Sequence, residues 1–223
     1  MSRLLLVVAL ELAYMVFTRT WLREHSTGIP RELWTTAFRL VNAAAYWALF
    51  KDLLAARAPG RARLKDPLLL AGLAAALLAP VLVGSEAMSS PAAAWVFAAT
   101  SLAVGLKEEL FFRGILQSLL ETRHGLIKAL VASNLLFIVY HYGAQPMTPA
   151  GVTEFFVMGC AFGLLYAATG SLVLPVAWHA LYDAVWCFTP FTARPWPRPW
   201  AAVFQLAALA CVALWARRAA AKR

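Results

Sequence analysis

Charged residues are scarce in this chain, making up only 14% of its 223 residues, whereas 62% are hydrophobic. A soluble domain carries roughly a quarter charged residues. A chain this apolar lacks the polar side chains that would cover a water-facing surface, so we expect the lipid bilayer to be its solvent. The length suits a single domain over residues 1–223, with room for several membrane spans of about 20 residues each.

Cysteine is also sparse, and its pattern argues against two further classes of protein. The three cysteines, Cys160, Cys187 and Cys211, form no CxxC pair, and each lies in or near an apolar stretch. A zinc ribbon or a disulfide framework is therefore disfavoured. We interpret all three as small buried hydrophobic residues.

The net charge of +9 comes from 20 Lys and Arg against 11 Asp and Glu. No basic groove or nucleic-acid-binding motif accompanies it, so we expect no nucleic acid partner. The charges lie in short stretches between apolar runs, which is typical of orientation signals at an anionic membrane surface.

Apolar runs recur at lengths that suit membrane-spanning helices. They predict an all-α, polytopic integral membrane helical bundle of about eight transmembrane helices. Gly, Pro and charged residues mark most of the breaks, and no clear cleavage site follows the first run, which we interpret as a retained helix. The expected spans are 3–20, 33–54, 66–85, 91–120, 125–145, 150–169, 171–190 and 199–217.

The distribution of Lys and Arg predicts the orientation of these spans. With the N-terminus inside, 14 of them lie on the cytoplasmic side, including Lys107 and Arg113, and 6 lie outside, including Arg39. This excess predicts that both termini are cytoplasmic. The alanine-rich composition and short loops suggest a bacterial inner membrane.

Ionisable groups at membrane depth are costly, and they mark functional sites unless they pair with one another. Glu11 and Arg39 lie on the first two expected spans. We interpret them as a structural ion pair between neighbouring helices, or as a case in which Arg39 reaches outward to the membrane interface.

A larger group begins in the segment GLKEELFFRGIL, which contains Glu108, Glu109 and Arg113. Glu109 and Arg113 are four residues apart, so they share a helix face and can pair. Glu108 points about 100° away from Glu109. Two adjacent carboxylates beside apolar walls suit a general base.

Two later segments add histidines. SNLLFIVYH places Phe137 and His141 on one helix face, and WHALYD does the same for His179 and Asp183. Either histidine alone is better explained as a packed structural residue. Counted at about 1.5 Å per residue from the expected cytoplasmic helix ends, however, the carboxylates and histidines lie roughly 12 to 24 Å deep. Their similar depth favours one shared site.

Taken together, the three motifs resemble the CPBP family of intramembrane proteases, which includes CAAX endopeptidases and bacteriocin-processing relatives. EExxxR matches Glu108, Glu109 and Arg113, FxxxH matches Phe137 and His141, and HxxxN or HxxxD matches His179 and Asp183. The resemblance covers about residues 91–190. It implies an endopeptidase core that hydrolyses a membrane-anchored protein or peptide, such as a C-terminal sorting signal or a bacteriocin precursor.

The resemblance also implies roles for these residues. Glu108 would activate water as general base, His141 would hold that water, and Glu109 and Arg113 would shape the site. His179 and residue 183 would stabilise the oxyanion. The CAAX endopeptidase pattern has Asn at the last position, and an ionised Asp cannot donate a hydrogen bond. We therefore expect Asp183 to accept from His179 and to keep its ring oriented or protonated.

Glu108, His141, His179 and Asp183 also form a candidate set of zinc ligands, so the cofactor is either none or zinc. The sequence has no HExxH pair, which would favour zinc directly, and we prefer the metal-free scheme. Two other functions stay open. A non-enzymatic immunity or scaffold protein of the same fold gains nothing from several buried ionisable groups. A small transporter is disfavoured because paired broken helices and a detectable repeat are absent.

Overall fold

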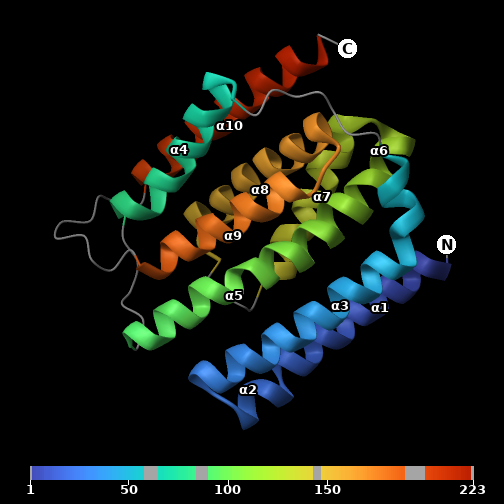
Figure 1. Cartoon of the computed structure of the whole chain (residues 1–223), viewed down its shortest axis with the longest axis vertical. Coiled ribbons are helices and arrows are strands. Elements are labelled where there is room, and N and C mark those ends of the chain that lie inside the picture. The colour runs from blue at the N-terminus through green and yellow to red at the C-terminus, as the bar shows by residue number, and fades with distance from the viewer. Residues whose placement is uncertain (1, 58–64, 84–89, 143–146, 189–198, 222–223) are drawn as a thin grey trace.

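The computed structural model describes residues 2–57, 65–83, 90–142, 147–188 and 199–221. The long helices lie side by side and alternate in direction, so that the two termini lie at the same end of the bundle (Figure 1). The elements are α1 (Ser2–Arg19), α2 (Trp21–His25), α3 (Gly28–Ala56), α4 (Pro67–Val83), α5 (Pro91–Glu109), η1 (Leu110–Gln117), α6 (Ser118–His124), α7 (Leu126–His141), α8 (Pro149–Thr169), α9 (Val173–Phe188) and α10 (Pro199–Ala220).

Each of the eight expected spans has a helical counterpart, and the predicted all-α membrane bundle is confirmed. The fourth span differs in detail, because it is a continuous run of α5, the π-helix η1 and α6. Part of the expected loop after the first span is helical, since it holds α2 and the start of α3. The expected span ends at 85, 145 and 190 lie outside the described residues.

Three described helical stretches, 3–25, 151–169 and 200–220, are long and apolar enough to cross a membrane. Shorter apolar helices cover 67–81, 126–141 and 173–188. The helices that carry several charged residues, α3 and α5, fall outside both groups.

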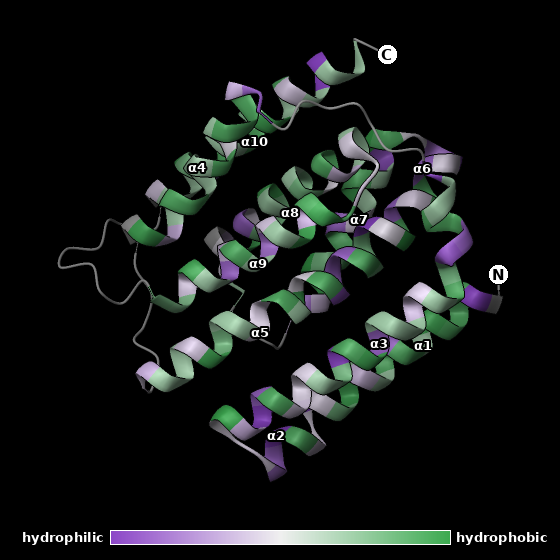
Figure 2. Cartoon of the chain, viewed as in Figure 1, coloured by the Kyte–Doolittle hydropathy of each residue, from purple (hydrophilic) through white to green (hydrophobic). Residues whose placement is uncertain are grey.

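The outward faces of the helices are apolar, as expected for a protein dissolved in lipid. Figure 2 shows hydrophobic residues along most of the long helices and hydrophilic residues gathered at α2 and α6, near the ends of the bundle. A water-soluble protein seldom exposes contiguous apolar patches of this extent. Exposed large apolar side chains include Leu5, Leu12, Val16, Trp34, Val41, Trp47, Trp95, Leu102, Ile127, Leu135, Val139, Val173, Val203 and Leu214.

Local sequence fixes where two of the central helices begin. Ser90 accepts a hydrogen bond at 3.1 Å from the backbone N–H of Ala93 and is followed by Pro91 at the start of α5. Thr148 caps α8 in the same way, with Gly151 as donor at 3.1 Å and Pro149 next in sequence. These caps satisfy N–H groups that a helix end leaves unpaired, and proline suits the first helical turn.

Two apolar clusters fill the interior. One joins α4, α8, α9 and α10 and includes Phe162 and Trp215, and the other joins α1, α3, η1 and α7 and includes Tyr46, Phe112 and Phe137. The polar residues of the candidate site lie where these two clusters meet, because Phe137 of one cluster contacts His141 and Phe162 of the other stacks on His179.

Candidate active site

The two adjacent carboxylates lie at the junction between α5 and the π-helix. Glu108 and Glu109 are the last residues of α5, and both are buried. Glu109 Oε1 lies 3.2 Å from Nη1 of Arg113, the pairing that their spacing allows. Segments of π-helix occur frequently at functional sites.

Arg113 is fully buried and is held from two further helices. Its Nη2 donates to Asn134 Oδ1 of α7 at 3.3 Å and to the carbonyl of Gly159 in α8 at 3.0 Å. The guanidinium also lies over the Phe137 ring, 4.8 Å from its centroid. A Cβ at Gly159 would come within 2.2 Å of Asn134 Oδ1 and 3.0 Å of Arg113 Nη2, so this arrangement requires glycine there.

His179 reaches the site from α9. Its Nδ1 donates to Glu109 Oε1 at 2.7 Å, and its ring stacks on Phe162 with centroids 5.0 Å apart. The backbones of α5 and α9 come close beside it, because a Cβ at Gly105 would lie 2.9 Å from the carbonyl oxygen of Val176. This glycine therefore lets His179 pack against the end of α5.

His141 is the last residue of α7. Its Nδ1 donates to the carbonyl of Phe137 at 2.9 Å, and its ring stacks on Phe155 with centroids 4.5 Å apart. A carbonyl oxygen only accepts, so Nδ1 carries a proton. The other ring nitrogen, Nε2, is left to face Glu108.

Glu108 lies between the two imidazoles. Its Oε2 is 3.7 Å from Nε2 of His141 and 3.9 Å from Nε2 of His179. Both distances are too long for direct hydrogen bonds. Among the described residues, this buried oxygen has no hydrogen-bond partner. An unsatisfied carboxylate oxygen at such a place can accept a proton from a third group, such as water.

Asp183 lies one turn after His179, with its Oδ2 3.6 Å from Nε2 of that ring. This distance is longer than a hydrogen bond. The expected hydrogen bond from His179 to Asp183 is therefore replaced by the bond to Glu109. Asp183 instead faces the same edge of the ring as Glu108 does.

A polar cavity of about 840 Å³ leads to these groups. Glu108, His141 and Asp183 line it together with residues of α1, α3, α5 and α7. The cavity extends to the α2 end of the bundle, where Arg23 and Gly28 also line it. The candidate site is thus buried within the bundle yet connected to one of its ends.

The zinc alternative has no direct support in the structure. Within the described part of the chain, no group of three or more His, Cys, Asp or Glu side chains is close enough to be identified as a metal site. We therefore derive no step through zinc from Glu108, His141, His179 and Asp183.

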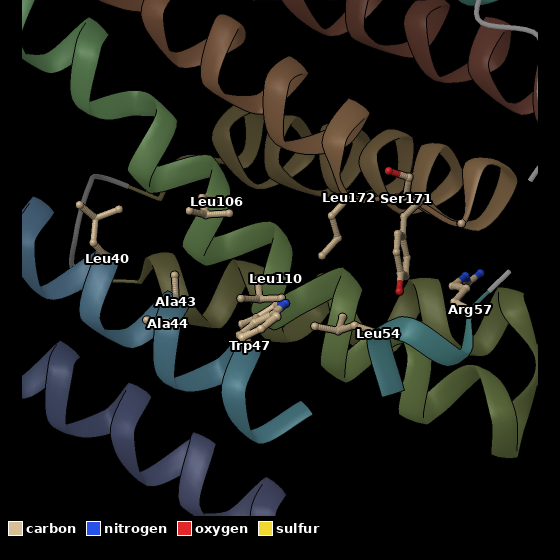
Figure 3. A pocket seen from close by; sticks show the side chains of 12 residues that line it. Leu40, Ala43, Ala44, Trp47, Leu54, Arg57, Leu106, Leu110, Ser171 and Leu172 are labelled. Atoms are coloured by element: carbon tan, nitrogen blue, oxygen red, sulfur yellow. The ribbon is translucent and has the colours of Figure 1, made fainter. Parts of the chain in front are cut away.

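A second cavity, of about 620 Å³, is predominantly apolar and lies between α3 and the α5 to η1 run (Figure 3). Leu40 and Trp47 of α3 line one side, and Leu106 and Leu110 line another. None of the candidate site carboxylates or histidines lines this cavity.

The expected pairing of Glu11 with Arg39 is wrong. Arg39 pairs with Glu32 of its own helix at 2.5 Å, whereas Glu11 is bound by Lys107. Lys107 was expected among the cytoplasmic charges, but it is fully buried and also donates to the Tyr140 hydroxyl at 2.7 Å. A lysine directly before the two glutamates, in an apolar run, is itself a signal of burial at membrane depth.

Other contacts of the site have no signal in the three motifs. Asn134 and Gly159 hold Arg113, and Phe155 and Phe162 stack on the two histidines. These residues lie outside the motif positions, so only the packing of α7 and α8 reveals them.

The fold and the buried polar site define an integral membrane protein of the polytopic helical class. Residues 90–185 match the family model described as type II CAAX prenyl endopeptidase Rce1-like. This segment holds all three motifs, and the match is consistent with the CPBP intramembrane protease family that they resemble. The match supports intramembrane protease activity in general. Comparison with curated proteins and with solved structures gives no significant match.

Proposed function

We propose that this chain is an intramembrane endopeptidase that hydrolyses a peptide bond of a membrane-anchored protein or peptide, with Glu108 activating the attacking water. One observation carries the proposal. The buried Oε2 of Glu108 has no hydrogen-bond partner among the described residues, and it faces Nε2 of His141 at 3.7 Å and Nε2 of His179 at 3.9 Å.

The first step uses Glu108 and His141. Because Nδ1 of His141 donates to a carbonyl, Nε2 of the neutral ring is an acceptor. A water between Nε2 and the Glu108 carboxylate can donate one hydrogen bond to each. Glu108 then takes one water proton as the oxygen attacks the substrate carbonyl carbon.

The second step uses His179. Glu109 accepts from its Nδ1, and three carboxylates within 4 Å of its ring favour the imidazolium form. Nε2–H of that ring then donates to the oxyanion of the tetrahedral intermediate. The intermediate collapses when the C–N bond breaks, and Glu108 returns its proton to the leaving amine. The products are a carboxylic acid and an amine, which exchange the remaining water proton to give a carboxylate and an ammonium group, and Glu108 is ionised again.

A matched pair of variants tests the proposal. Wild type and Glu108→Gln would be purified in nanodiscs and offered a library of lipid-anchored peptides, with cleavage followed by mass spectrometry. Glu24→Gln, at an exposed position on α2, is the control. We expect wild type and control to cleave the same peptides. We expect Glu108→Gln to be slower by at least about a hundredfold, the range for loss of a general base.

Other outcomes have distinct meanings. Equal cleavage by wild type and Glu108→Gln would remove Glu108 from the mechanism. Loss of cleavage on adding a chelator, with recovery on adding zinc, would favour a metal-dependent enzyme over the metal-free scheme. Wild type would also be tested on the proteins of a membrane extract from its own cells. If it cleaves neither these proteins nor any peptide of the library, a scaffold or immunity function of the same fold is favoured.

We also propose that the protein lies in a bacterial inner membrane with both termini in the cytoplasm. Lys107 and Arg113 are buried, and Arg39 is half-buried and paired with Glu32, so we do not count these three as orientation signals. The remaining Lys and Arg keep an excess on the side of the termini. A C-terminal fusion to a fluorescent protein should fluoresce, and a fusion to alkaline phosphatase should be inactive. An inactive fluorescent fusion together with an active phosphatase fusion would show that the C-terminus lies outside the cytoplasm.

A further inference from the structure

The entrance of the site cavity is lined by arginines. Arg19, Arg23 and Arg31 line it at or beside α2, and Arg39 lines it about two turns further along α3. Two of them are engaged within the protein. Arg19 donates to the backbone carbonyls of Tyr140 and Tyr142, and Arg39 pairs with Glu32.

The other two arginines are available to a ligand. Arg23 is exposed and Arg31 is half-buried, and within the described residues neither guanidinium has a hydrogen-bond or ion-pair partner. Of the three carboxylates that line the cavity, Glu32 lies beside Arg31 and is paired with Arg39, whereas Glu108 and Asp183 belong to the candidate site. Arg23 and Arg31 therefore leave a net positive charge at the entrance, and the two carboxylates of the candidate site lie at the inner end.

The packing of α3 against α5 gives the distance between these two ends. Thr100 of α5 donates to Glu32 of α3 at 2.8 Å, which sets these two residues at one level. The two helices run in the same direction (Figure 1). Glu108 lies eight residues after Thr100, so it lies about 12 Å deeper than Glu32 and its neighbour Arg31.

An extended peptide advances about 3.3 Å per residue. A chain that has its scissile bond at Glu108 and runs toward the entrance therefore reaches Arg31 after roughly three to four residues. A carboxylate at that position can form charge-assisted hydrogen bonds with both free guanidinium groups, which suit carboxylates because of their planar donor geometry.

We propose that Arg23 and Arg31 form a carboxylate-binding subsite for the substrate peptide, three to four residues from the scissile bond. The subsite rests on the proposed protease function. The carboxylate is either an Asp or Glu side chain or the free C-terminus of the peptide. The cationic entrance thus fixes how far the chain enters the cavity and which bond meets Glu108.

The test compares wild type, the double variant Arg23→Gln/Arg31→Gln, and the control Arg123→Gln, whose arginine is exposed on α6. A peptide that wild type cleaves would be made with Asp or Asn at each position around the scissile bond, and with a free or amidated C-terminus. We expect a carboxylate three to four residues from the scissile bond to raise kcat/KM roughly tenfold over the matched neutral peptide, mainly by lowering KM. The double variant and high salt should remove this preference, and Arg123→Gln should keep it.

The peptide series separates the two sources, since a side-chain carboxylate responds to Asn and a terminal one responds to amidation. Equal cleavage of every member by wild type would overturn the subsite and leave the protease intact. Binding of the same peptides to Glu108→Gln, measured by fluorescence anisotropy, tests the subsite even if no cleavage is seen. Equal affinity of this variant for acidic and neutral peptides overturns the proposal.

An anionic lipid headgroup is the competing occupant. Nanodiscs of phosphatidylcholine, with and without phosphatidylglycerol, separate it from a peptide. If the double variant changes only the response to phosphatidylglycerol, and not the preference for acidic peptides, the arginines bind lipid and the proposal is wrong.

Discussion

Nδ1 of His179 donates to Oε1 of Glu109 at 2.7 Å, and the same carboxylate oxygen lies 3.2 Å from Arg113. The second glutamate of the EExxxR motif therefore holds a histidine from another helix, besides pairing with its own arginine. This bond fixes the ring and leaves its Nε2 directed toward Glu108 and Asp183. Partners of this kind set both the orientation and the proton position of a functional imidazole.

Glu109→Gln tests this positioning role. The amide can still accept a hydrogen bond from His179, but it loses the negative charge that favours the imidazolium. We expect kcat to fall roughly 10- to 100-fold with little change in KM, because the charge acts on the transition state. Cleavage of a lipid-anchored peptide in nanodiscs would measure both constants. A change in KM alone would instead place Glu109 in substrate binding.

Asp183 makes no hydrogen bond to His179, which lies 3.6 Å away, and its carboxylate can therefore act on the substrate or on the charge of the ring. Replacement by Asn separates these roles, because an amide can donate to an oxyanion. We expect Asp183→Asn to keep nearly full cleavage and Asp183→Ala to lose roughly 10- to 100-fold. If Asn is as damaging as Ala, the negative charge at 183 is what the enzyme requires.

The sequence predicted the helices well because each apolar run has the length that a bilayer demands. The depth of the motif residues was also readable, since the rise of a helix is fixed. Partners across helices were not readable. Glu11 pairs with Lys107 and not with Arg39. Which of the two residues pairs with Glu11 depends on which faces of α1, α3 and α5 pack together. Hydropathy along one helix carries no information on that rotation.

Gly159 illustrates the same limit and gives a third prediction. In the sequence it is one of several small residues in α8, but a Cβ there would meet Asn134 Oδ1 at 2.2 Å. We expect Gly159→Ala to lower the free energy of unfolding by about 1–3 kcal/mol, the usual cost of overpacking. It should also lower cleavage, because the displaced Asn134 and Arg113 no longer hold Glu109.

Thermal unfolding in detergent and peptide cleavage would measure the two effects of Gly159→Ala. Val152→Ala is the control, since Val152 lies on the same helix and its side chain is exposed. A variant with wild-type stability and wild-type cleavage would show that α8 shifts to admit the methyl group without moving Arg113.

Lys107 and Glu11 form a fully buried ion pair next to Glu108 in sequence. The Tyr46 and Tyr140 hydroxyls complete it, one on each partner. Removing one charge leaves the other buried and unpaired, at a cost of about 3–5 kcal/mol. We therefore expect Lys107→Met to unfold at a markedly lower temperature than wild type in detergent.

The double variant Lys107→Met/Glu11→Gln removes both charges, and a buried pair replaced as a whole is often nearly neutral. We therefore expect the double variant to recover most of the lost stability, as a double-mutant cycle in thermal unfolding would show. Cleavage gives the second readout. If stability returns but kcat does not, Lys107 also acts on Glu108 through its charge. If both return, the pair only fastens α1 to α5 and plays no part in catalysis.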